Sequence, residues 1–395
     1  MKSVIIKLCF IFLLVVIAFF SCKKPFNPDV PSNNFNLLVV EGFINTGADS
    51  TIIKLSRTGN VDNNNAIPEE GATVTVESDA GDKYNLPAKP KGIYASASLG
   101  LSSTKKYRVV IKTSGGSVYE SDFVQPKQSP PVDVKWTTKE DGVYLNVSTQ
   151  DATKNSRYYR WEFEEAWIFY AAYESLFKSI GDTMIKRNLI DDNIYKCWGS
   201  GKSANILLGT SVKLQDDIIA MNQIGIISSN SEKLSERYSI LVKQYALSKE
   251  AFDFWEGLKA TTENLGSIFD VQPSQVTGNI HNTANAEEPV IGFISAGTVS
   301  TQRIYINKSE LPIWKVTYPF DCLNPPASFY TNPQLGQLSE KQYMHETYSF
   351  VALLPIYSTD PVTGITGPIT GYTGASVDCA DCTKRGTNKK PAFWQ

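Results

Sequence analysis

The sequence contains little histidine and no recognisable catalytic motif. It has two histidines, His281 and His345, and neither belongs to an H-E-x-x-H pattern or another two-ligand spacing. The common zinc-hydrolase motif is therefore excluded. No G-x-S-x-G is present, which excludes the nucleophile turn of the α/β-hydrolases. We expect a non-enzymatic protein with no catalytic residue, no cofactor and no metal ligand.

The chain also lacks a basic excess and a long apolar run after residue 20. It has 38 Lys and Arg against 40 Asp and Glu, and removing residues 1–21 would leave 36 against 40. Proteins dedicated to nucleic acids carry a basic excess, so we expect no nucleic-acid partner. Without a second apolar run, the rest of the chain is expected to be soluble apart from an N-terminal anchor.

The N-terminus resembles an export signal. Two lysines precede an unbroken apolar run of 13 residues, Leu8–Phe20. A membrane-spanning helix needs about 20 residues, whereas a signal peptide needs about 7–15. The dipeptide Ser21-Cys22 follows, as in bacterial lipoproteins, which are cut before the cysteine and acylated on its thiol. Phe19 and Phe20 depart from the commonest form of that signal, so an uncleaved anchor or an ordinary secretory signal is the alternative.

We therefore predict a lipoprotein signal peptide over residues 1–21, a lipid on Cys22 and a polar tether over residues 22–34. Two or three acyl chains make a stable membrane anchor, whereas one does not.

Four further cysteines would remain in the exported chain: Cys197, Cys322, Cys379 and Cys382. Export exposes them to an oxidising compartment, where disulfides are the default. Four cysteines allow three pairings, and the sequence does not choose among them. The C-x-x-C at 379–382 could instead be a redox pair or half of a zinc site, although it has neither the helix nor the second ligand pair. We predict at least one disulfide that ties the C-terminal tail to the second domain.

Short β-branched stretches separated by Gly, Asn and Asp turns predict strands in the first third of the chain. They are Phe35–Asn45, Thr51–Arg57, Ala72–Ser78, Lys83–Leu86, Gly92–Ser98, Tyr107–Thr113 and Ser117–Val124. No helical pattern interrupts them, which favours an antiparallel, immunoglobulin-like β-sandwich over residues 35–126. A Pro-rich linker is expected over residues 127–131.

A second β-sandwich, of fibronectin III kind, is expected over residues 132–395. Its predicted strands are Val132–Trp136, Val143–Thr149, Tyr158–Tyr170, Pro289–Ile294 and Gln302–Ile306. In Tyr158–Tyr170 the odd positions are mostly aromatic and the even positions largely polar, which indicates a half-buried strand. We interpret these rings as core, with a stacking surface for sugars as the alternative.

One helix is expected as an insertion in the second domain. Ser248 is a plausible N-cap, and Gly266 stands where a helix would end. The Gly- and Thr-rich stretch Ser358–Val377 is expected to be a loop. The predicted fold class is therefore mostly β, with two β-sandwich domains and a helical insertion in the second.

Three local patterns resemble functional motifs but are explained by an ordinary structural role. Gly199–Ser203 (GSGKS) resembles a phosphate loop, but Lys196 replaces the first glycine, so we expect a loop beside a disulfide. The oxygen-rich Asp62–Asn65 lacks the sixth-position glycine of a calcium loop and is expected to connect strands. Adjacent carboxylates such as Glu164 and Glu165 would point to opposite faces of a strand and form no catalytic pair.

Several motifs together resemble the Bacteroidota lipoprotein family known as domain of unknown function 4249. They are SCKKPF, LVVEGFI at Leu38–Ile44, RYYRWEFEEAW at Arg157–Trp167, RYSILVKQYALSKEAFDFW at Arg237–Trp255, PSQVTGNI with EEPVIGFIS at Pro273–Ser295, and CADCTKRGTNKKPAFW at Cys379–Trp394. The resemblance implies an outer-membrane lipoprotein, lipidated at Cys22, whose gene often neighbours a TonB-dependent transporter. It implies no enzyme activity. No acidic residue follows Cys22 before Asp29, which leaves the cell surface and the periplasmic face as alternatives.

From these patterns we expect an accessory binding module that works with a TonB-dependent outer-membrane transporter in nutrient or ligand uptake. A structural or adhesive protein of the cell envelope is the second hypothesis, and an unrecognised hydrolase is the third.

Overall fold

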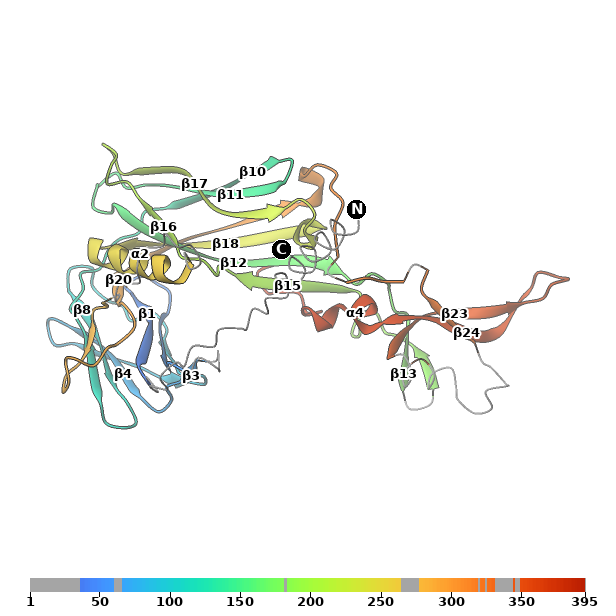
Figure 1. The fold of residues 1–395 in the computed structure, drawn as a ribbon, viewed down its shortest axis with the longest axis horizontal. Helices are drawn as coiled ribbons and strands as arrows, with labels where there is room; N and C mark the ends of the chain where they lie inside the picture. The colour runs from blue at the N-terminus through green and yellow to red at the C-terminus, as the bar shows by residue number, and fades with distance from the viewer. Residues whose placement is uncertain are drawn as a thin grey trace, which may run out of the picture.

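The chain builds two units of paired β-sheets and a long β-arm (Figure 1). The computed structural model describes residues 36–59, 66–180, 183–263, 277–318, 320–323, 325–330, 344 and 349–394. The prediction of a mostly β fold is confirmed. The signal peptide, Cys22, the tether, Asp62–Asn65 and His345 lie outside the described residues.

Two sheets form the N-terminal unit. The first has the order β20-β1-β2-β7-β6, with β3 paired to β2, and the second has the order β19-β9-β8-β4-β5. The strands of the first are β1 (Leu38–Asn45), β2 (Thr51–Arg57), β3 (Ile67–Pro68), β6 (Ala88–Lys89), β7 (Ile93–Ser96) and β20 (Ser295–Gly297). Those of the second are β4 (Thr73–Ser78), β5 (Lys83–Leu86), β8 (Tyr107–Lys112), β9 (Val118–Ser121) and β19 (Ile280–Asn282). One hydrophobic cluster joins the two sheets, with Val40 and Leu55 from the first and Val74 and Val109 from the second.

A late segment of the chain completes this unit. β19 pairs with β9, and β20 pairs in parallel with β1, so residues 280–297 extend both sheets. From the sequence we expected this segment to belong to the second domain and to form a strand over Pro289–Ile294. Of that stretch only Ile291 forms a bridge, to Val39, and the strand begins at Ser295. Local periodicity does not encode a pairing partner so distant in the sequence.

The central unit also contains two sheets that share a core. The first has the order β10-β11-β17, and the second has the order β15-β12-β18-β21 with β16 paired to β12. The strands are β10 (Val132–Lys139), β11 (Gly142–Gln150), β12 (Tyr158–Tyr170), β15 (Lys196–Lys202), β16 (Leu207–Thr210), β17 (Ile218–Ser228), β18 (Arg237–Leu247) and β21 (Val299–Asn307). Tyr159 and Trp161 of β12 are buried in the shared core beside Val143 and Leu145 of β11. This burial supports the interpretation of these odd-numbered rings as core.

Helix α2 (Lys249–Glu263) lies between the two units (Figure 1). The predicted N-cap is confirmed, because the Ser248 hydroxyl accepts a hydrogen bond from the Ala251 amide at 3.2 Å. The helix packs Phe252 against Tyr158 of β12, and its cluster includes Phe43 from β1. Gly266 lies outside the described residues. Two short 3₁₀ turns lie elsewhere in this unit: η1 (Glu232–Leu234) connects β17 to β18, and η2 (Lys308–Glu310) follows β21.

The arm extends away from both units on the right of Figure 1. Its strands are β13 (Phe177–Ile180), β14 (Thr183–Lys186), β22 (Ala327–Tyr330), β23 (Phe350–Thr359) and β24 (Thr366–Ser376). The predicted loop over Ser358–Val377 is wrong, since most of it is β24, which pairs with β22 and β23. The glycines serve packing here: a Cβ on Gly371 would lie 2.1 Å from the Phe329 carbonyl oxygen, so only glycine fits beneath β22.

Two disulfides fasten the C-terminal segment, as predicted. Cys197 of β15 is bonded to Cys382, and Cys322 is bonded to Cys379. The two cysteines of the C-x-x-C therefore join distant cysteines and not each other. They lie in the short turns α4 (Val377–Ala380) and η5 (Cys382–Lys384).

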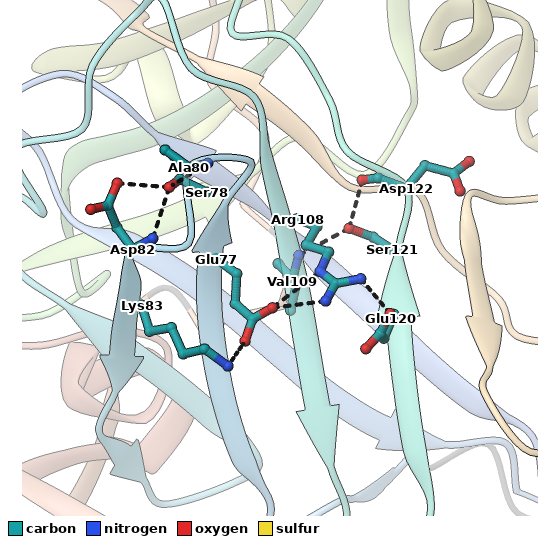
Figure 2. A network of polar contacts seen from close by, with 10 residues as sticks. All are labelled: Glu77, Ser78, Ala80, Asp82, Lys83, Arg108, Val109, Glu120, Ser121 and Asp122. Carbon is teal, nitrogen blue, oxygen red and sulfur yellow. Dashed lines mark hydrogen bonds and ion pairs between the residues drawn. The ribbon is translucent and has the colours of Figure 1, made fainter.

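A network of charged side chains covers the polar face of the second N-terminal sheet (Figure 2). Arg108 of β8 donates to Glu77 at 2.9 Å and also contacts Glu120. Lys83 lies 2.6 Å from the other oxygen of Glu77. Lys83 and, to a smaller extent, Arg108 hold the pKa of Glu77 below its ordinary value, although burial acts in the opposite direction.

This network predicts a pH-dependent contribution to stability. Because the pKa of Glu77 is lower in the folded chain, its contribution is complete above the pKa of the unfolded carboxyl and is lost as the pH falls through the folded value. We expect the unfolding free energy of Glu77→Gln to change less than that of the wild type between pH 6 and about pH 3. Urea unfolding at several pH values measures this, and parallel curves for the two proteins would contradict it.

Candidate ligand-binding cleft

The candidate site lies on the outer face of the β15-β12-β18-β21 sheet. Along β12 the odd positions enter the core, so Arg160, Glu162 and Glu164 occupy the opposite face. Their neighbours on β18 are Tyr245, Lys243 and Leu241, in that order. This face is therefore lined by charges, with one aromatic ring at the end nearest helix α2.

At that end a cleft of about 660 Å³ opens between the sheet, helix α2 and strand β1 of the N-terminal unit. We call it the junction cleft. Its walls include Phe43, Arg160, Glu162, Tyr245, Trp255 and Phe293. The volume falls in the range of small-molecule sites, which form preferentially at the boundary between domains.

Arg160 and two aromatic rings form the centre of the junction cleft. The guanidinium carbon lies 4.7 Å from the ring centroid of Tyr245 and 4.2 Å from that of Trp255. Its Nη1 lies 2.5 Å from Glu162 Oε1, and the Tyr245 hydroxyl donates to Glu162 Oε2 at 3.0 Å. Burial, followed by the charge of Glu162, raises the pKa of Tyr245, so the phenol remains a proton donor. These contacts hold the guanidinium within cation–π distance of both rings.

The charged side chains that line the junction cleft are Glu41, Asp49, Arg160, Glu162 and Lys243, and most of them are paired: Glu41, for example, lies 2.6 Å from Lys54. Arg160 is paired with Glu162, and Lys243 lies 2.8 Å from Glu164. Ring faces from three different segments, Phe43, Trp255 and Phe293, supply apolar surface. Such a site suits a ligand with an apolar or ring face and few net charges, fixed in orientation by a small number of polar groups.

The structure keeps the residues singled out in the sequence apart from this cleft. The four disulfide cysteines lie at β15 and in the C-terminal segments. His281 is on β19, exposed, with Nε2 3.7 Å from an oxygen of Asp122. Glu164 and Glu165 point to opposite faces as predicted, since Glu165 accepts a hydrogen bond from Tyr238 at 2.8 Å while Glu164 contacts Lys243.

The GSGKS stretch is strand and not the expected loop. Residues 196–202 form β15, where Gly199 is paired with Trp167 and Gly201 with Glu165. A Cβ on Gly199 would lie 2.3 Å from the Trp167 indole. The glycines therefore make room for large side chains on the neighbouring strand, which accounts for their presence without a phosphate.

This explanation predicts that Gly199→Ala destabilises the chain. The added methyl group would overlap the Trp167 ring, and overpacking of this kind typically costs about 1–3 kcal/mol. The matched control is Gly225→Ala on β17, where the Cβ would lie 3.8 Å from Leu145 in ordinary contact. Thermal unfolding of both variants measures the difference, and equal stabilities would contradict the packing role.

Sequence reasoning did not identify Arg160, Tyr245 or Trp255 as site residues. One signal was available, because Arg160 is the single basic residue of this strand and stands at an outward position between aromatic residues. The partners that turn it into a site come from β18 and α2, whose approach depends on the tertiary fold.

The part of the chain that the structure describes holds neither a metal-binding cluster nor a membrane-spanning helix. Within the ranges given above, no group of three or more His, Cys, Asp and Glu side chains could hold a metal ion. In the same residues, no helix has the length and apolar character to cross a membrane.

Comparison with known proteins gives one family. No curated protein matches the sequence. The sequence model of a family described as domain of unknown function (DUF4249) matches residues 23–303, which is more than half of the chain. The chain therefore belongs to the DUF4249 family.

Proposed function

We propose that this protein is an outer-membrane lipoprotein that binds a ligand without chemical conversion and serves a TonB-dependent transporter in its uptake. The junction cleft carries the proposal, because it offers a ligand-sized space lined by aromatic rings, with one guanidinium held against two of them. The Ser21-Cys22 signal supports attachment to the membrane, on a face that the sequence leaves open.

The exposed surface of the arm supports the proposal that the protein binds a protein partner. Large apolar side chains are exposed along β23 and β24, and at the hairpin between them Val362 is 91% and Ile365 is 66% exposed. An apolar surface of this kind marks a contact site more often than a free surface. A transporter in the same membrane is the occupant that we propose for it.

A pull-down tests the partner. Mild detergent extraction of the tagged protein should recover a β-barrel transporter, and the double variant Val362→Asp/Ile365→Asp should lose it. The matched control Val212→Asp/Leu214→Asp changes two exposed apolar residues of the central unit and should retain the transporter. Recovery of the lipoprotein alone, after cross-linking and in several detergents, would favour the structural or adhesive hypothesis.

An uptake assay tests whether the junction cleft binds the transported ligand. Deleting the gene should impair uptake of the transporter's substrate while barrel abundance stays unchanged, and the Trp255→Ala variant should fail to restore uptake. Full restoration by Trp255→Ala would remove the junction cleft from the mechanism. Turnover of chromogenic hydrolase substrates by the purified protein would favour the third hypothesis.

The anchor gives a separate prediction. We expect Cys22→Ser to abolish acylation, because a serine cannot form the thioether, and the variant should no longer partition into the detergent phase. Phase separation in a cloud-point detergent measures this. Unchanged partitioning would contradict a lipid on Cys22.

A further inference from the structure

A second cleft, of about 650 Å³, lies on the same outer sheet face at the end away from helix α2. We call it the tail cleft, because residues 387–393 form one of its walls. β15 and Arg303 of β21 form the others. The junction cleft and the tail cleft are separated by the Lys243–Glu164 pair.

Four cationic side chains line the tail cleft: Lys202, Arg303, Lys389 and Lys390. Two carboxylates also border it, but Glu164 is paired with Lys243 and Glu165 with Lys233. Among the described residues, no carboxylate lies within ion-pair distance of Lys202, Lys389 or Lys390, although Glu164, whose pKa is lowered chiefly by Lys243, also feels the charges of Lys202 and Arg303. The chain as a whole has a net charge of −2, so this is a local excess of positive charge.

The edge of β15 adds backbone donors to the same space. The Trp198 amide donates to the Thr387 carbonyl at 2.8 Å, whereas the Ser203 amide donates to Phe163 of β12 at 2.9 Å. Backbone groups alternate in direction along a strand, so the amides of Ser200 and Lys202 point to the same side as that of Trp198. These amides therefore face the tail segment across the cleft.

The wall made by the tail is held in place at both ends. Cys382 is bonded to Cys197 on β15. Next to this disulfide, Trp198 of β15 exchanges two backbone hydrogen bonds with Thr387 of the tail. At the other end Trp394 is buried against Ala166 and Ile168 of β12. Lys389 and Lys390 are thus presented from a segment with a fixed position, which reduces the entropy lost when a ligand binds.

Arg303 is a partly buried residue in the wall of the tail cleft. Its guanidinium carbon lies 3.7 Å from the ring centroid of Phe393, and Nη1 donates to the Ser239 hydroxyl at 3.0 Å. Burial lowers the pKa of Arg303, while the charges of Tyr305 and Glu164 act in the opposite direction. Phe393 also gives the cleft an apolar wall.

We propose that the tail cleft binds a small molecule carrying two or more oxyanion groups, such as phosphates, sulfates or carboxylates. Cations on both sides of the cleft, together with the strand-edge amides, suit two separate oxyanions better than one. The GSGKS stretch contributes Ser200 and Lys202 as part of a strand edge, not as a nucleotide loop. The proposal does not depend on the function proposed for the junction cleft.

Calorimetric titration of the purified full-length protein in non-ionic detergent tests this. The probes are inorganic phosphate, pyrophosphate and citrate, at 50 mM salt. We expect saturable binding of pyrophosphate or citrate at least tenfold tighter than that of phosphate. The double variant Lys389→Ala/Lys390→Ala should bind at least tenfold more weakly. The matched control Lys89→Ala/Lys112→Ala removes two exposed lysines of the N-terminal unit and should bind as the wild type does.

The outcomes are distinct. Loss of pyrophosphate binding in micelles that contain an acidic phospholipid would assign the site to a lipid headgroup, and unchanged binding would assign it to a free anion; both support an oxyanion site. No saturable binding of any probe would overturn the proposal. Equal weakening in the two double variants, with unchanged melting temperatures, would also overturn it, because net charge alone would then explain the binding.

Discussion

Replacing both Cys197 and Cys382 with alanine should lower the unfolding free energy by about 3–5 kcal/mol. This disulfide closes a loop with a sequence separation of 185 residues, and restraint of the unfolded chain grows with loop length. Both sulfurs are buried beside Phe169, so the variant also loses packing. Urea unfolding measures the change. Trypsin should also cleave the native variant faster at the Lys and Arg residues of 384–390, because the tail is no longer fastened.

The second disulfide provides the comparison. Cys322–Cys379 closes a separation of 57 residues, for which the same argument gives a loss smaller by about 1 kcal/mol. Its removal should leave trypsin cleavage at 384–390 close to the wild-type rate, since Cys382 remains bonded. A larger loss of stability from the shorter loop would contradict the loop-length argument.

Gln244→Ala should cost about 3 kcal/mol of unfolding free energy. The side chain is fully buried on β18 and accepts a hydrogen bond from the Trp161 indole at 2.9 Å. It donates to the Pro130 carbonyl at 2.8 Å and to the Thr149 hydroxyl at 3.0 Å. The alanine would leave the Trp161 indole N–H and the Pro130 carbonyl buried without a partner, at about 1 kcal/mol or more for each, and it would add a cavity; the Thr149 hydroxyl keeps its bond to the Pro131 carbonyl.

Gln244 thus binds the linker between the two units to the core of the second. The matched control Gln150→Ala removes an exposed glutamine from β11 and should change stability by less than about 0.5 kcal/mol. Chemical unfolding, followed by tryptophan fluorescence, compares them. Similar stabilities of the two variants would show that the buried contacts are dispensable.

The sequence predicts a strand or a helix well where local interactions alone determine its residue pattern. β12 and β5 occupy the predicted bounds, because alternation and turn residues act locally. Helix α2 was found from its cap and its first turn. β24 was missed because glycines and threonines were read as turn formers, whereas Gly371 and Gly374 are needed beneath Phe329.

The candidate site was less predictable for a physical reason. The junction cleft combines β1, β12, β18, α2 and the segment near Phe293. Because these elements are far apart in the chain, no residue spacing in the sequence predicts the cleft. The tail cleft likewise joins Lys202 to Lys389 through a disulfide whose pairing the sequence leaves open. Local patterns could therefore identify the cysteines, but they could not show which surfaces the cysteines bring together.

The late strands of the N-terminal unit constrain the order in which the chain can mature. Tyr119 donates to Glu288 across 169 residues, and β1 and β9 each gain a partner only when residues 280–297 are present. During synthesis, which proceeds from the N-terminus, the first unit keeps two open strand edges until most of the central unit has been made. A product truncated before residue 280 would keep those edges exposed, and exposed edges favour aggregation. The first unit can therefore be completed only after nearly three quarters of the chain has been made.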